Sequence, residues 1–168
     1  LGFHTQLHHD GARNRHGYDQ NEKMPVAITL GGDPSLLFAA SAPLPPFLSE
    51  MMFAGFLRRE GVEMVKCITQ DLEVPADSEI VIEGYVNPGE KETEGPFGDH
   101  TGYYSLADQY PVIHITAITM KRNPVYPATI VGRPPMEDAY LGLATERIFL
   151  PLIQMVHPEI KDMHLPPF

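Results

Sequence analysis

The sequence contains a single cysteine, Cys67, among its 168 residues. One cysteine permits no disulfide within the chain and no cysteine-rich zinc site, so we expect a reducing compartment such as the cytoplasm. No run of about 18 apolar residues is present, and we therefore expect no membrane span. Basic residues are also scarce, because 12 Lys and Arg stand against 22 Asp and Glu and give a formal net charge of −10. An acidic surface does not attract nucleic acid, so we expect no such partner.

The residues that are present fit one globular domain with a core, since the length and the 43% apolar content are ordinary. The first residues, LGFHTQLHHDG, have neither the basic start nor the apolar middle of a signal peptide. Leu1 is an unusual first residue, and the sequence stops abruptly after HLPPF. We expect the chain to be a piece of a longer protein.

Apolar patterning predicts more strands than helices. Strands are expected at 24–32, 62–69, 79–86, 110–120 and 125–132, and helices at 33–42, 47–61 and 136–156. We expect 62–69 to pair with 79–86, and 110–120 with 125–132, because short turn-like segments join them. Pro151 should kink or divide the last helix. Adjacent strand pairs without strand–helix alternation indicate an antiparallel barrel or sandwich with a few helices.

The segment EGPFGDHTGYY, residues 94–104, lies in a long connection between two predicted strands. Such loops are usually functional or disordered, and three aromatic side chains should anchor this one to the body of the domain: Phe97, Tyr103 and Tyr104. Glu94 and Asp99 could converge on one bound molecule. A buried carboxyl pair repels itself, so one member can stay protonated near neutral pH and act as an acid. The alternative is a surface loop whose carboxylates are solvated.

Two further groups of residues suit a ligand less specifically. The segment LHHDGARNRH contains three histidines, and either His8 or His9 could reach a metal ion, although a polar surface segment explains them equally. Glu50 lies in the first turn of the predicted helix 47–61, with Ser49 as its N-cap. A carboxylate there stabilises the helix by about 0.3–1 kcal/mol through the dipole alone, so its position requires no ligand. We infer no site from His114 or Arg133.

Taken together, the motifs resemble the UbiD-type (de)carboxylase family, which uses prenylated flavin mononucleotide. Five stretches carry the resemblance in family order over almost the whole chain: PLPPFLSEMMFAG, VEMVKCITQDLEVPADSEIVIEGYV, EGPFGDHTGYY, VGRPP and HPEIKDMHLPP. The resemblance implies a mainly β (α+β) fold, a split β-barrel of the flavin reductase-like type with a few peripheral helices. It also implies that residues 1–168 are a central flavin-binding domain, without the N- and C-terminal domains of the family.

The resemblance also assigns roles to residues. Glu50 and His8, with His9 as the fallback, match the family's ligands for a divalent metal, usually Mn²⁺, which bridges to the flavin phosphate together with K⁺. Cations suit this place because a dianionic phosphate is costly to bury alone. Ser41 and Ala42 are candidates around K⁺ and the phosphate.

Glu94 and Asp99 match the two acids of the family's Glu-Arg-Asp/Glu network. By resemblance, Asp99 donates the proton that replaces carbon dioxide, and Glu94 supports the arginine and the cofactor. The family's arginine and a metal-binding asparagine lie upstream of the histidine, where this sequence contains neither. Arg13 and Arg15 follow His8 and do not match that arginine.

The implied activity is the reversible, non-oxidative decarboxylation of an aromatic or α,β-unsaturated carboxylic acid by the full-length parent, which we expect to be a homo-oligomer. A different reading is a flavin-nucleotide-binding or assembly module without catalysis, and a third is a structural remnant that binds neither. A domain cut from a longer protein should also expose apolar faces that its neighbours would cover.

Overall fold

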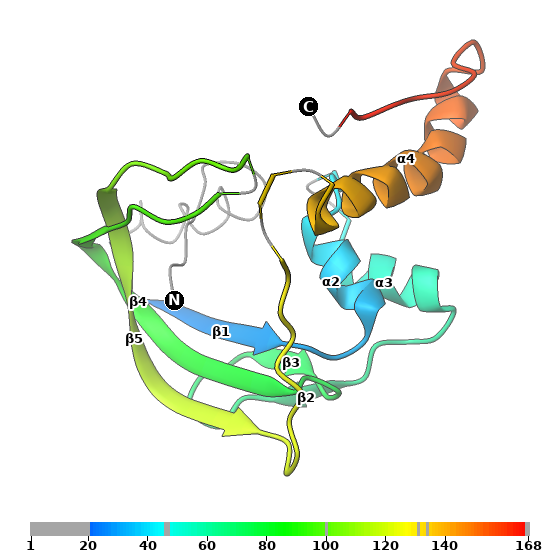
Figure 1. Ribbon diagram of the computed structural model, residues 1–168. Coiled ribbons are helices and arrows are strands. Elements are labelled where there is room, and N and C mark those ends of the chain that lie inside the picture. Colours follow the sequence, from blue (N-terminus) through cyan, green and yellow to red (C-terminus); the bar gives the residue numbers. More distant parts are fainter. Residues whose placement is uncertain (1–20, 46–47, 100, 131, 134, 167–168) are drawn as a thin grey trace. The chain divides into compact units, whose positions relative to one another are not determined.

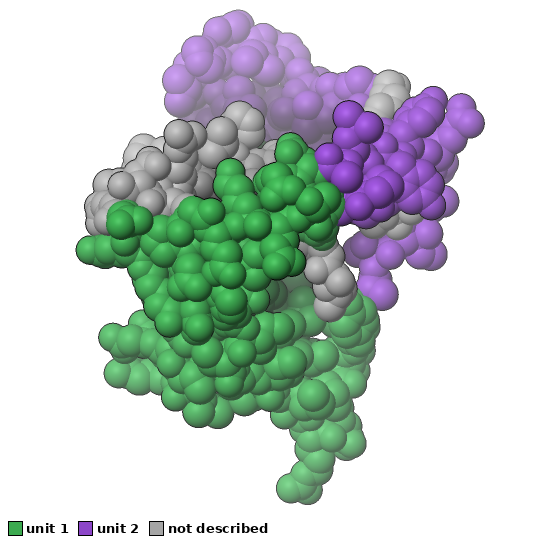
Figure 2. Space-filling model, turned by 90° about the vertical axis from the view of Figure 1, so that its left-hand side faces the viewer, with its two compact units in different colours: residues 1–94, 108–127 green, residues 95–107, 128–168 purple. Residues whose placement is uncertain are grey.

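The computed structural model describes residues 21–45, 48–99, 101–130, 132–133 and 135–166. The chain forms two compact units, which Figure 2 shows in green and purple. Unit 1 comprises residues 1–94 and 108–127, and unit 2 comprises residues 95–107 and 128–168. In the part of the chain that is described, no helix is both long and apolar enough to cross a membrane.

A three-stranded antiparallel sheet forms the centre of unit 1. Its order is β1-β4-β5, from β1 (Met24–Leu30), β4 (Ile80–Glu94) and β5 (Asp108–Met120). Figure 1 shows that β4 and β5 are long and strongly curved. Isoleucines pair across all three strands, because Ile82 lies opposite both Ile28 and Ile118. These β-branched side chains suit a pleated, half-buried surface, which explains why the sequence forms strands here.

Two irregularities interrupt the pairing of β4 with β5. The first leaves Thr116 without a directly opposite residue, since Glu83 pairs with Ala117 and Gly84 with Ile115. Glycine is required there, because a Cβ on Gly84 would collide with the His114 carbonyl oxygen. The second irregularity falls between Val86 and Lys91. Bulges of this kind bend a strand and increase its twist, which accounts for the curvature of the sheet.

A short hairpin packs beside the sheet and is fixed by a buried carboxylate. It consists of β2 (Met64–Lys66) and β3 (Glu73–Pro75). The side chain of Glu83 on β4 is 1% exposed and accepts hydrogen bonds from the backbone N–H groups of Ile68 and Thr69, at 2.9 and 2.6 Å. Burial by itself raises the pKa of Glu83, but these hydrogen bonds outweigh it and hold the pKa below its ordinary value.

Two helices follow β1 in unit 1, and their contact forms much of the small core. Asp33 caps α2 (Pro34–Ser41) by accepting a hydrogen bond from Ser35 N at 2.8 Å. The packing of α2 on α3 (Glu50–Arg58) brings the rings of Phe38 and Phe53 to 6.3 Å between centroids. Buried residues of the pair are Leu36, Phe38, Ala39, Phe53 and Ala54.

The start of α3 matches the expectation, and its end comes earlier than expected. Ser49 occupies the N-cap position and Glu50 lies in the first turn, as predicted, although the Ser49 side chain makes no capping hydrogen bond. The Ser49 carbonyl accepts the first helical bond from Phe53 N. The last helical residue is Arg58, and Arg59 caps the helix in the left-handed conformation with φ 59°, so the helix does not extend to Gly61.

In unit 2, helix α4 (Glu137–Val156) continues through Pro151, so of the two predicted outcomes, a kink or a division, the division does not occur. The segment that follows the helix returns along it and is held by side chains of α4. Arg147 donates to Asp162 Oδ1 and to the Met163 carbonyl, at 2.8 and 3.0 Å. Gln154 donates to the carbonyl of Ile160 at 3.0 Å.

The described chain is mainly β with a few helices, as predicted, but both predicted strand pairings are wrong. Residues 64–66 pair with 73–75, inside the segment expected to be a turn, while 80–94 pairs with β1 and β5. Residues 124–130 form no strand. Pro124 and Pro127 cannot donate to a ladder, and Val125 N instead donates to the Glu79 carboxylate at 3.0 Å. The sheets of the described residues are open, with no closed barrel among them.

Candidate functional site

Asp99 lies at the start of a tight hairpin turn in unit 2, within the motif EGPFGDHTGYY. The Gly102 N–H donates to the Asp99 carbonyl at 3.0 Å, and the Asp99 N–H donates to the Tyr103 carbonyl at 2.9 Å. Gly98 and Tyr104 form a bridge just outside this turn. The next pair outward closes the hairpin, since Ser105 N donates to the Phe97 carbonyl at 2.8 Å.

The side chain of Asp99 is fixed from within the same turn. Its Oδ2 atom accepts a hydrogen bond from the Thr101 hydroxyl at 2.9 Å and lies 3.5 Å from the Thr101 backbone nitrogen. Aspartate often bonds to the backbone two residues ahead in this way and so stabilises a turn. The carboxylate is therefore partly enclosed and oriented, and not a freely rotating surface group.

Gly102 allows the turn to close, and it also brings Arg133 close. Its φ of 87° lies in the left-handed region, where other residues are strained. A Cβ added to Gly102 would lie 3.3 Å from Arg133 Cβ, so Arg133 lies beside the turn that carries Asp99. The side chain of Arg133 is exposed.

Two of the three expected aromatic anchors do not hold this segment down. Tyr103 and Tyr104 are each 78% exposed, so the prediction that these two rings anchor the segment is wrong. Phe97 is 39% exposed, and its anchoring role stays a prediction. The backbone bonds between the two arms order the hairpin.

Glu94 is the last residue of β4 and lies opposite Asp108, the first residue of β5. The connection between the two strands is shorter than expected, because β4 continues beyond Val86 and β5 begins before Tyr110. Glu94 belongs to unit 1 and Asp99 to unit 2. Their convergence on one bound molecule stays a prediction.

The residues proposed to lie near a phosphate and its cations gather at the end of α2 and the start of α3. Ser41 is the last residue of α2, and its hydroxyl donates to the Phe38 carbonyl at 3.0 Å. Ala42 caps the helix, and its carbonyl accepts a hydrogen bond from Leu44 N at 2.8 Å. Glu50 opens α3.

These donors suit hard cations in their chemistry. Carboxylate, hydroxyl and carbonyl oxygens are the ligands that Mn²⁺ and K⁺ accept, and helix carbonyls at the end of α2 add partial negative charge. Among the described residues, no three His, Cys, Asp or Glu side chains come together as a metal site. The candidate ligands His8 and His9 lie outside the described residues.

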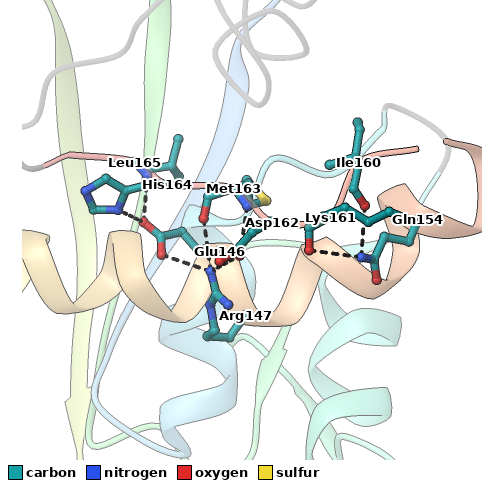
Figure 3. Close-up of polar contacts among 9 residues, drawn as sticks. All are labelled: Glu146, Arg147, Gln154, Ile160, Lys161, Asp162, Met163, His164 and Leu165. Atoms are coloured by element: carbon teal, nitrogen blue, oxygen red, sulfur yellow. Dashed lines mark hydrogen bonds and ion pairs between the residues drawn. The ribbon is translucent and has the colours of Figure 1, made fainter. Parts of the chain in front are cut away.

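Sequence reasoning missed a buried carboxylate in unit 2. Figure 3 shows Glu146 of α4 beneath the returning C-terminal segment, where it accepts hydrogen bonds from Leu165 N at 2.6 Å and His164 Nδ1 at 3.0 Å. The bond from Leu165, opposed by burial and aided by His164 and Arg147, holds the pKa of Glu146 below its ordinary value. His164 and Leu165 are 18 and 19 residues away from Glu146, so no local spacing could reveal these contacts.

A second missed cluster lies on the sheet of unit 1. His114 stacks on Tyr85 with 5.0 Å between ring centroids, and its Nε2 lies 2.7 Å from Glu90 Oε2. Lys23 Nζ lies 3.2 Å from the centre of the Tyr85 ring. The hydrogen bonds from His114 and Asn87 hold the pKa of Glu90 below its ordinary value. His114, from which the sequence predicted no site, is a hydrogen-bonded residue of β5.

Comparisons with known proteins give this geometry its context. The family model described as "3-octaprenyl-4-hydroxybenzoate carboxy-lyase Rift-related domain", UbiD, matches residues 1–134. An uncharacterised protein of Archaeoglobus fulgidus is 55% identical over 167 residues, which cover 98% of this chain and 35% of that protein. The chain thus spans about a third of the length of this relative.

Two solved structures are similar over nearly the whole chain. An evolved dimeric form of the UbiD-class enzyme HmfF from Pelotomaculum thermopropionicum, in complex with prFMN, is 36% identical, with a TM-score of 0.85 over 99% of this chain and 39% of that chain. The vanillic acid decarboxylase of Sedimentibacter hydroxybenzoicus, in its closed form, is 33% identical, with a TM-score of 0.86 over 96% of this chain and 35% of that chain. Because the UbiD family model matches residues 1–134, which are most of this chain, the chain belongs to the UbiD family of carboxy-lyases.

Proposed function

We propose that the full-length protein carrying this chain catalyses the reversible, non-oxidative decarboxylation of an aromatic or α,β-unsaturated carboxylic acid with prenylated FMN. Residues 1–168 are its central flavin-binding domain, and the sheet β1-β4-β5 is part of a split barrel. The observation that supports this best is the placement of Asp99. In this chain, which belongs to the UbiD family, Asp99 lies in a tight, hydrogen-bonded turn, and one of its carboxyl oxygens accepts a hydrogen bond from Thr101.

Asp99 acts as the general acid in this proposal. When the bond between the substrate carbon and its carboxylate breaks, carbon dioxide leaves and the electron pair stays on the carbon. The proton of the neutral Asp99 carboxyl group then forms the new C–H bond, and Asp99 becomes a carboxylate. An oriented acid typically contributes a factor of about 10²–10⁴ to the rate. Glu94, at the end of β4, supports the upstream arginine and the cofactor.

The end of α2 and the start of α3 hold the phosphate end of the cofactor. Glu50 supplies a carboxylate for a divalent ion such as Mn²⁺, with His8, or His9 in its place, as the second ligand. Ser41 and Ala42 would supply oxygens for K⁺ near the phosphate. When bound, prenylated FMN supplies an electron sink for the pair left by carbon dioxide, and the protein supplies placement and the proton.

The test uses the full-length protein, loaded with prenylated FMN and Mn²⁺. Carbon dioxide release is measured from a panel of aromatic and α,β-unsaturated acids that includes vanillic acid, which the solved relative decarboxylates according to its name. We expect Asp99→Asn to lower kcat by about 100-fold or more. Asp108→Asn is the matched control, because this exposed carboxylate begins β5 and has no role in the proposal; it should retain kcat within about twofold.

Release of carbon dioxide from none of these acids would contradict the decarboxylase proposal. Unchanged turnover in Asp99→Asn would remove Asp99 as the acid while leaving the family's chemistry in place. Glu50→Gln provides a separate check on the metal. It should weaken the binding of FMN only when Mn²⁺ is present, because the substitution removes the negative charge that the cation needs.

A second role is assembly, with the chain binding flavin nucleotide without turnover by itself. Exposed apolar side chains on α4 favour it, including Tyr140 at 67%, Met155 at 82% and Val156 at 73%. A large apolar surface is a usual sign of a contact with another protein surface. Titration of the 168-residue chain with FMN, with and without Mn²⁺, separates the roles, since tight binding without turnover supports the module.

A further inference from the structure

The hairpin around Asp99 contains two aliphatic side-chain hydroxyls, those of Thr101 and Ser105, and they contact different kinds of atoms. Thr101 Oγ1 donates to the carboxylate of Asp99 at 2.9 Å. Ser105 Oγ accepts a hydrogen bond from the backbone N–H of Phe97 at 3.2 Å. One hydroxyl therefore contacts the proposed acid, and the other contacts only the arms of the hairpin.

The turn itself is closed by backbone bonds that do not involve the Thr101 hydroxyl. They run from Gly102 N to the Asp99 carbonyl and from Asp99 N to the Tyr103 carbonyl, at 3.0 and 2.9 Å. A further pair joins Phe97 and Ser105. The Thr101 hydroxyl is thus an addition to a turn that has its own bonds, and its distinctive contact is with the Asp99 side chain.

We infer that Thr101 is a positioning residue, which orients the carboxyl group of Asp99 for proton transfer. This inference rests on the proposed function, in which Asp99 is the acid. It assigns to Thr101 an effect on the chemical step and not on substrate binding.

The orientation follows from the donors that face Oδ2. The Thr101 hydroxyl and, more weakly, its backbone N–H lie near Oδ2, at 2.9 and 3.5 Å. Both contacts come from a residue two positions ahead of Asp99, so they restrict the rotation of the carboxyl group within the turn.

Orientation matters because proton transfer requires the acid to lie within hydrogen-bond reach of the receiving carbon and in line with it. A carboxyl group that rotates about its last bond presents either oxygen in turn. The bond from Thr101 removes that freedom before the substrate reacts. Loss of the bond should lower kcat and leave KM almost unchanged, since the substrate need not touch Thr101.

The experiment compares three variants of the full-length holoenzyme, each assayed on the panel acid that the wild type decarboxylates fastest. Thr101→Val keeps the shape of the side chain but loses the hydroxyl, whereas Thr101→Ser keeps the hydroxyl. Ser105→Ala removes the hydroxyl that contacts Phe97 in the same hairpin. We expect Thr101→Val to lower kcat by about tenfold with KM within about twofold. Thr101→Ser should recover kcat to within about threefold of the wild type, and Ser105→Ala should remain near it.

Crystal structures of the variants give a readout that does not depend on turnover. In Thr101→Val the Asp99 carboxyl group should leave its wild-type orientation, whereas in Ser105→Ala it should keep it. An unchanged carboxyl orientation in Thr101→Val, or equal losses of kcat in Thr101→Val and Ser105→Ala, would overturn the inference. The proposed function fails separately, if Asp99→Asn turns over normally or if no acid on the panel releases carbon dioxide.

Discussion

One oxygen of Glu83 accepts both the backbone N–H and the hydroxyl of Thr69, each at 2.6 Å. The other oxygen accepts the N–H of Ile68 at 2.9 Å, so the buried carboxylate holds the segment that joins β2 to β3. Thr69 Oγ1 also lies 2.6 Å from the hydroxyl of Thr116, the residue at the bulge of β5. One side chain on β4 thereby connects the hairpin to the sheet at the point where the sheet bends.

Replacement of Glu83 should therefore destabilise unit 1. Glu83→Ala leaves two backbone N–H groups and one hydroxyl without their acceptor, and we expect the free energy of unfolding to fall by about 3 kcal/mol. Glu92→Ala on the same strand is the matched control, because Glu92 is exposed and should change stability by less than about 0.5 kcal/mol. Chemical denaturation followed by circular dichroism measures both. Equal losses in the two variants would contradict the role given to Glu83.

The same carboxylate predicts how stability depends on pH. Burial opposes ionisation of Glu83, but its hydrogen bonds hold the folded-state pKa below the ordinary value of 4.5. The unfolded chain therefore takes up its proton at higher pH than the folded chain does. The stabilisation by this group is complete above that ordinary value and is lost as the pH falls through the lower, folded-state pKa.

Glu83→Gln should lose less stability than the wild type on acidification from about pH 7 to about pH 4, because it has no carboxylate to titrate. Denaturation midpoints at a series of pH values provide the measurement. Glu79 and Glu90 also have lowered pKa values and remain in the variant, so part of the acid sensitivity should persist. If the denaturation midpoints of the variant and the wild type fall in parallel as the pH is lowered, Glu83 contributes nothing to the acid sensitivity.

Glu146 should hold the C-terminal segment on α4. Glu146→Ala removes the acceptor for Leu165 N and His164, so residues 160–166 should lose protection from proteolysis and hydrogen exchange while α4 itself persists. Glu159→Ala is the control, since the Glu159 side chain is 72% exposed and forms its ion pair with His157, which lies outside residues 160–166. Exchange measured by mass spectrometry should rise at the segment in the first variant alone. A rise throughout α4 would mean that the helix, and not the segment, depends on Glu146.

The elements that the sequence predicted correctly are those specified by local pattern. β-branched runs identified β1 and the central parts of β4 and β5, and helical spacing identified α3 and α4. Pairing was predicted wrongly because it depends on contacts between distant segments. The extension of β4 to Glu94 was also missed, since NPGEKETE is polar and contains Pro88 and Gly89, which normally end a strand.

In the candidate site, too, the features that depend on local sequence could be predicted and those that depend on distant contacts could not. The position of Glu50 in a first turn follows from helix rules, and the bond from Thr101 to Asp99 could have been found from the Asp-x-Thr spacing, which is typical of such turns. The contacts of Glu146 with His164 and Leu165 and of Glu90 with His114 could not, because these partners lie 18 or more residues away in the sequence. The roles of His8, Glu50, Glu94 and Asp99 stay predictions.

Gly84 offers a test of the bulge that bends the sheet. Gly84→Ala adds a Cβ that collides with the His114 carbonyl oxygen, a backbone atom that cannot move without disturbing the ladder between β4 and β5. We expect the free energy of unfolding to fall by about 2 kcal/mol or more. Gly61→Ala is the matched control, because no atom lies within 4 Å of the added Cβ.

The stacked pair of Tyr85 and His114 should report the same change, because both residues adjoin the site of the collision. The Tyr85 fluorescence and the His114 imidazole resonances should therefore shift in Gly84→Ala and remain at their wild-type positions in Gly61→Ala. If Gly84→Ala unfolds at the same denaturant concentration as the control, the carbonyl has room to move. The curvature of β4 and β5 would then need a cause other than the close approach at this glycine.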